Sequence, residues 1–121
     1  MRYFEIEPPR QFEVGETPVK IRHVANVELD ADELISLVSP DNRELDIVAK
    51  AWGYYVTPSL QGRLKRNGMR AALMRNVMTR QLFVVAVHQD EIESWETYMK
   101  AENQELVIWL DLLDSMPPAA K

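Results

Sequence analysis

The chain has 121 residues, of which 46% are hydrophobic and 27% are charged, and its formal net charge is −5. This composition is typical of a globular protein rather than a disordered one, and the length fits one domain with its own core. The absence of cysteine excludes disulfides, thiolate metal sites and thiol catalysis. No apolar run approaches the roughly 18 residues of a membrane-spanning helix, and MRYFEIEPPR lacks a signal-peptide core, so we expect a soluble, cytoplasmic protein.

The first two predicted elements are strands. Residues 2–7, RYFEIE, alternate apolar and polar side chains, and we expect Pro8 and Pro9 to end this strand because proline has no N–H to donate. Residues 19–29, VKIRHVANVEL, alternate again after a loop. One face of this second strand carries Val19, Ile21, His23 and Ala25.

Residues 30–50 allow two interpretations. Asp30 can cap a short helix over residues 31–38, with Leu34, Ile35, Leu37 and Val38 as its apolar residues. Alternatively, residues 33–38 and 44–50 form a hairpin around SPDNR. The Pro-Asp-Asn turn and the β-branched residues favour the hairpin.

An aromatic strand and a short helix are predicted next. Residues 52–56, WGYYV, are extended, Thr57 supplies an N-cap oxygen, and Pro58 suits the first helical position. The helix covers about residues 58–66 and ends before Gly68, which can adopt the left-handed conformation that follows many helices.

A second hairpin, residues 70–76 and 81–88, follows this helix. Residues 81–88 are apolar on both faces, so we expect this strand at the centre of the sheet. Met69, Met74 and Met78 surround the hairpin and are expected to fill gaps in the core. An exposed Met78 on the turn at 77–80 would instead indicate a tip that docks a protein.

The last predicted elements are a helix and a strand. Asp90 and Glu93 resemble a capping box, and Asn103 closes the helix. Residues 105–110 form the final strand. We expect one domain, residues 1–113, followed by a flexible tail, residues 114–121.

The order of these elements predicts an α+β fold with an antiparallel sheet and two helices. From residue 45 onward the order is strand, helix, strand, strand, helix, strand, which is the β-α-β-β-α-β order of ferredoxin-like folds. The N-terminal strands, including the first hairpin, extend this sheet or cover its open face.

The basic residues are concentrated in one segment of an acidic chain. No acidic residue occurs between Asp46 and Asp90, a stretch that holds seven of the 14 basic residues. The predicted helix N-terminus exposes free N–H groups that suit a phosphate or carboxylate. The candidate binding residues are Thr57, Ser59, Arg63, Lys65, Arg66, Arg70, Arg75 and Arg80, with Trp52, Tyr54 and Tyr55 as an aromatic lining.

Three classes of partner fit a basic surface. The first is an acidic protein or a second copy of this chain, which we favour, in a non-catalytic accessory or regulatory binding protein. The second is a small anionic ligand at the N-terminus of the helix at 58–66, in a binding or enzymatic domain. The third is nucleic acid, with bases stacked on the aromatic residues, although the pI of about 5.0 argues against it.

No motif identifies an enzyme. The sequence has no phosphate-binding glycine loop, no nucleophile elbow and no metalloprotease motif. His88, Asp90 and Glu91 form the one stretch typical of metal ligands, but they are better explained as a strand end and a helix start. We therefore predict no catalytic residues, metal or cofactor.

Residues 52–76, WGYYVTPSLQGRLKRNGMRAALMRN, carry a recognisable pattern. With VIWLD at 107–111, they resemble a family of small uncharacterised bacterial proteins that share W-G-x-Y-x-T-P-S-x-x-G-R-L. The resemblance covers roughly residues 45–111. It implies that the turn at Thr57–Leu64 is a family feature, and it implies no activity.

Overall fold

The computed structural model describes residues 1–115. The chain forms two compact units, Met1–Pro58 and Ser59–Lys121. The first unit is built from strands, the second combines three strands with short helices, and all strand pairs are antiparallel. None of the helices in the described part of the chain is long and apolar enough to span a membrane.

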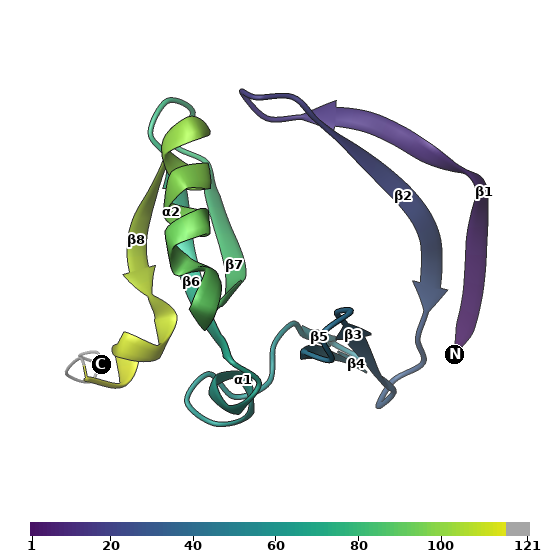
Figure 1. The fold of residues 1–121 in the computed structure, drawn as a ribbon. Coiled ribbons are helices and arrows are strands. Elements are labelled where there is room, and N and C mark those ends of the chain that lie inside the picture. Colours follow the sequence, from purple (N-terminus) through teal and green to yellow (C-terminus); the bar gives the residue numbers. More distant parts are fainter. Residues whose placement is uncertain (116–121) are drawn as a thin grey trace. The chain divides into compact units, whose positions relative to one another are not determined.

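The first unit begins with a two-stranded ribbon of β1 (Arg2–Val14) and β2 (Val19–Glu28) (Figure 1). The prediction that Pro8 and Pro9 end the first strand is wrong, because β1 continues through them with a shift of register between Glu5 and Arg10. Proline is tolerated here because β1 has a partner on one side only, and because the shift interrupts the ladder at this point.

The first unit also contains a three-stranded sheet with the order β3-β4-β5. Its strands are β3 (Leu34–Val38), β4 (Glu44–Lys50) and β5 (Gly53–Tyr55). The predicted hairpin is confirmed over the alternative helix. Its turn is held by Ser39, whose N–H donates to Arg43 O at 2.8 Å, and by Asn42 in the left-handed region at φ 66°. Asn is among the residues that tolerate this conformation best.

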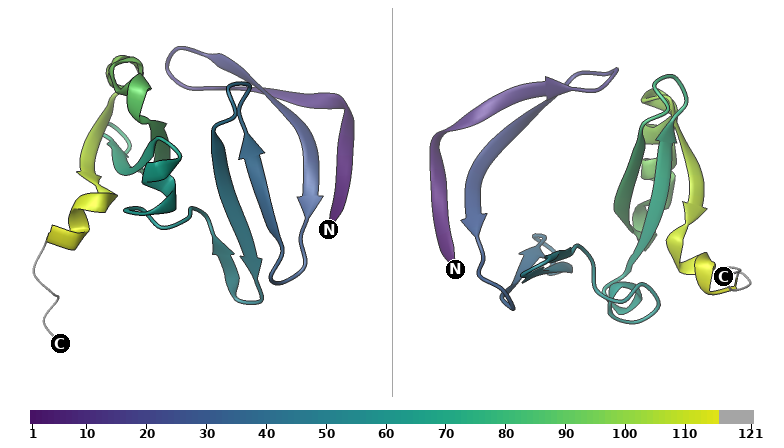
Figure 2. Two further views of the ribbon diagram at one scale, coloured as in Figure 1. Left: turned by 60° about the horizontal axis from the view of Figure 1, so that its bottom comes forward. Right: turned by 180° about the vertical axis from the view of Figure 1, so that it is seen from behind.

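The second unit is a three-stranded sheet with the order β7-β6-β8. Figures 1 and 2 show α2 along one face of this sheet, where Trp95 of α2 packs on Trp109 of β8 with ring centroids 5.1 Å apart. The elements are α1 (Arg63–Arg66), β6 (Met69–Asn76), β7 (Leu82–His88), η1 (Gln89–Glu91), α2 (Ile92–Ala101), β8 (Gln104–Trp109) and η2 (Leu110–Ser115).

The core of the second unit is centred on β6 rather than on β7. Ala71, Ala72 and Met74 of β6 are buried, whereas Leu82 and Val84 of β7 are both 58% exposed. The prediction that residues 81–88 form the central strand is therefore wrong. Ala71 and Ala72 point to opposite faces of the sheet and both are buried, so β6 is covered on both faces, and it lies between β7 and β8.

The sheet pairing does not confirm the ferredoxin-like arrangement. The predicted succession of elements along the chain is present, but β5 pairs with β4 in the sheet of the first unit, and β8 pairs directly with β6. The boundary between domain and tail stays a prediction. Residues 114 and 115 end η2, and residues 116–121 lie outside the described part.

Candidate functional site

The predicted helix at 58–66 is wrong in its extent, because α1 is only the four residues Arg63–Arg66. The preceding residues form a turn in which Ser59 Oγ accepts the N–H of Arg63 at 3.0 Å and Ser59 O accepts the N–H of Leu64 at 3.0 Å. A serine side chain that bonds to the backbone in this way competes with helix formation. Thr57 therefore caps no helix, and the predicted anion site at a helix N-terminus has no basis.

Gly62 closes this turn and is the N-cap of α1. A Cβ atom at Gly62 would collide with Oγ of Ser59, the atom that accepts the N–H of Arg63. The glycine therefore makes room for the serine hydroxyl, and this explains a residue type that is otherwise unfavourable close to a helix.

Helix α1 carries three exposed cations and is held against the sheet by one buried leucine. Leu64 is fully buried and packs α1 against β6, so Arg63, Lys65 and Arg66 are left on the exposed side. Within residues 1–115, no carboxylate lies within ion-pair distance of Lys65 or Arg66. We call these three residues the α1 basic surface.

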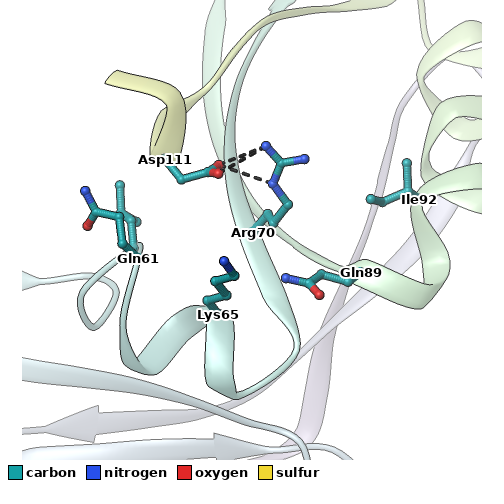
Figure 3. A pocket seen from close by; sticks show the side chains of 7 residues that line it. Gln61, Lys65, Arg70, Gln89, Ile92 and Asp111 are labelled. Carbon is teal, nitrogen blue, oxygen red and sulfur yellow. Dashed lines mark hydrogen bonds and ion pairs between the residues drawn. The ribbon is translucent and has the colours of Figure 1, made fainter. Parts of the chain in front are cut away.

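Arg70 is neutralised inside the second unit. Its Nε and Nη2 donate to Asp111 Oδ1 at 3.2 and 3.1 Å, and Nη2 also donates to Oδ2 at 3.1 Å (Figure 3). The guanidinium also lies 4.1 Å from the ring centroid of Trp109. Both charged side chains are about one-quarter exposed, so Arg70 is a fixed structural cation rather than a free one.

The remaining predicted cations do not join the α1 basic surface. Arg75 donates to Glu105 at 2.9 Å across the β6–β8 pair. Arg80 has no ion-pair partner in the described residues, but it follows the turn after β6, at the opposite end of that strand from α1. Eight strand residues span about 26 Å, at roughly 3.3 Å per residue. The predicted basic face is therefore divided.

A pocket of about 540 Å³ lies beside the α1 basic surface. Lys65 of α1 and Gln89 of η1 extend toward the space next to the Arg70–Asp111 pair (Figure 3). The full lining is Leu60, Gln61, Lys65, Arg70, Gln89, Ile92 and Asp111. Sequence reasoning named only Lys65 and Arg70 as site residues, because the other five come from turns and helix ends where no local pattern indicates a pocket.

The β6–β7 turn is ordered by one side chain. Asn76 Oδ1 accepts the N–H groups of Met78 at 2.9 Å and of Thr79 at 3.0 Å, and Arg80 follows in the left-handed region at φ 66°. Met78 is 73% exposed at this turn. An exposed Met78 is what the sequence predicts for a tip that docks a protein, whereas a buried Met78 would fill the core.

The aromatic lining lies in the first unit. Trp52, Tyr54 and Tyr55 are 69%, 61% and 56% exposed, and Trp52 meets Tyr55 edge to face with ring centroids 5.5 Å apart. Thr57 also belongs to the first unit, whereas the candidate residues from Ser59 to Arg80 belong to the second. The aromatic residues are therefore not counted as part of the α1 basic surface.

Within residues 1–115 no group of three or more His, Asp or Glu side chains is placed to hold a metal ion. Comparisons with protein-family models, with curated proteins and with solved structures give no match. The function must therefore be inferred from the residues themselves.

Proposed function

We propose that this chain is a non-catalytic accessory or regulatory binding protein that docks an acidic segment of a protein partner on the α1 basic surface. The observation that carries the proposal is the pair of exposed cations, Lys65 and Arg66, which have no carboxylate partner in residues 1–115 and stand beside a pocket.

The chemistry of the pocket favours a carboxylate-bearing partner. Arg70 is held by Asp111, so the incoming group is met by the ammonium of Lys65 and by the amide groups of Gln61 and Gln89. Lys65 and Arg66 lie next to each other on a chain of net charge −5, so together they attract an acidic partner to α1.

A small anion in the same pocket is the second candidate function. The volume of about 540 Å³ falls in the range of roughly 300–1,000 Å³ typical of small-molecule sites. This candidate predicts that inorganic phosphate or sugar phosphates at millimolar concentration raise the melting temperature of the isolated protein. The docking proposal predicts no such rise.

The test is affinity capture from the native host at low salt, with the wild-type chain and two charge-reversed variants. Lys65→Glu/Arg66→Glu alters the α1 basic surface, and Lys20→Glu/Lys100→Glu changes the net charge equally at two exposed lysines elsewhere. We expect a stoichiometric acidic protein that the wild type and the control retain and the first variant loses.

Two results would contradict the docking proposal. A partner held equally by all three proteins docks elsewhere, and an eluate that contains nucleic acid but no protein indicates the third class of partner. Circular dichroism of each variant shows whether the chain is still folded, so that a loss of binding is not confused with unfolding.

A further inference from the structure

Strand β7 is an edge strand without the usual protection. Natural edge strands carry charges, prolines, bulges or a covering segment that prevent pairing with another chain. The seven residues of β7, LFVVAVH, contain no Lys, Arg, Asp, Glu, Pro or Gly. Leu82, Phe83 and Val84 are 58%, 43% and 58% exposed. The opposite edge, β8, differs, because it carries Glu105 and pairs with β6 through a register shift.

We propose that two copies of the chain pair their β7 strands antiparallel, about a two-fold axis at Val85, so that two three-stranded sheets form one sheet of six strands. Because β7 is not part of the α1 basic surface, this inference does not depend on the proposed function.

The hydrogen bonds of β7 determine which residues can pair. Gln89 N–H donates to Gly68 O at 2.8 Å, and Asn76 N–H donates to Gln81 O at 2.9 Å. Residues with odd numbers therefore direct their backbone groups toward β6, and those with even numbers direct theirs outward. The outward groups belong to Leu82, Val84, Ala86 and His88.

Centring the pair on Val85 uses all of these outward groups. Leu82 then lies opposite His88 of the second copy, and Val84 lies opposite Ala86 of the second copy. On the face shared with Ala72 and Met74, Phe83 lies opposite Val87 of the second copy, so that the apolar layer under α2 continues across the axis.

The charges just beyond the two ends of β7 favour a second copy of the chain as the partner, in the antiparallel orientation. Arg80 precedes β7 and has no ion-pair partner within residues 1–115, and Asp90 and Glu91 follow it. Antiparallel pairing brings Arg80 of each copy to the acidic end of the other, whereas parallel pairing places Arg80 against Arg80. The charges at the two ends of β7 are thus complementary to those of a second, antiparallel β7.

Sedimentation velocity over a dilution series tests the proposal. The wild-type chain, of 14.0 kDa, should form a dimer that dissociates on dilution, since the interface is one strand long. Val84→Pro should be monomeric and folded, because the N–H that it removes points outward. Val84→Lys is the second variant, in case the proline disturbs the strand.

A charge swap makes the test specific to the antiparallel pair. Arg80→Glu and Asp90→Lys should each weaken the dimer by about tenfold, because each replaces two attractive contacts with two repelling ones. An equimolar mixture of these two variants should dimerise again, because both contacts in the mixed dimer are attractive. Lys65→Glu/Arg66→Glu should leave the dimer unchanged.

Three results would overturn the pairing. The first is a wild-type chain that is monomeric at every concentration, the second is a dimer that survives both substitutions at Val84, and the third is a mixture of the two charge variants that stays monomeric.

Discussion

The Arg70–Asp111 pair forms one wall of the pocket, and its strength can be measured by a double-mutant cycle. The pair has three charge-assisted hydrogen bonds of 3.1–3.2 Å, and each side chain is about one-quarter exposed. Exposed pairs contribute roughly 0–1 kcal/mol, and breaking a buried pair costs about 3–5 kcal/mol. We therefore expect a coupling energy of about 1–2 kcal/mol.

The single substitutions should differ, because Arg70 has a second partner. Arg70→Ala also loses the contact with the ring of Trp109, which adds roughly 0.5–1 kcal/mol to its cost. Asp111→Ala loses the ion pair alone. Arg70→Ala should therefore destabilise the protein more than Asp111→Ala does.

Urea unfolding of the wild type, both single variants and the double variant, followed by tryptophan fluorescence, supplies the four free energies of unfolding. A coupling energy below about 0.3 kcal/mol would refute the reasoning, because it would mean that water already screens the pair as it does at an open surface. In that case Arg70 would also be free to bind a carboxylate, and the role given to Lys65 in the pocket would need revision.

Three further predictions concern single turns. Gly62→Ala should destabilise the protein by about 0.5–1.5 kcal/mol in urea unfolding, because the new Cβ displaces the Ser59 hydroxyl from its hydrogen bond. The double variant Ser59→Ala/Gly62→Ala should lose less stability than the two single variants lose together, because both remove the same hydrogen bond. Hydrogen bonds from Arg43 and from a serine lower the pKa of Asp41 from 3.8 to about 2, so its stabilising contribution is present above pH 3.8 and lost as the pH falls toward 2. Arg43→Gln should raise this pKa toward 3.8 in a carboxyl NMR titration, and an unchanged value would contradict the assignment. Asn76→Ala should speed amide exchange at the two N–H groups of the β6–β7 turn, and unchanged exchange would show that the backbone alone orders it.

Local patterns in the sequence were sufficient to predict most elements. The alternation in residues 19–29, the turn at SPDNR and the helix signals between Asp90 and Asn103 each correspond to an element in the structure. These signals depend on neighbouring residues only, so they do not require knowledge of the sheet pairing.

Pairing between distant segments could not be predicted. The apolar run at 81–88 is equally compatible with a central strand and with an edge strand that another chain covers, and only the register with β6 distinguishes them. The extent of α1 depends on whether Ser59 bonds to the backbone or leaves it to form a helix, and helix-start patterns do not resolve that choice.

The candidate site was predicted in part for the same reason. The cluster of cations was visible in the sequence, but the partners that neutralise Arg70 and Arg75 lie 41 and 30 residues away. Arg70 and Arg75 are neutralised, and Arg80 lies at the other end of β6. The cations that can act together are therefore Arg63, Lys65 and Arg66.

The most direct test of docking on the α1 basic surface is an NMR titration of the ¹⁵N-labelled chain at low salt with an acidic peptide, either oligoglutamate or the acidic segment of a captured partner. Saturable shifts confined to residues 60–66, Arg70 and Gln89, and absent in Lys65→Glu/Arg66→Glu, are the predicted result. Shifts centred elsewhere, or no shifts with a captured partner that still binds the intact chain, would contradict the account.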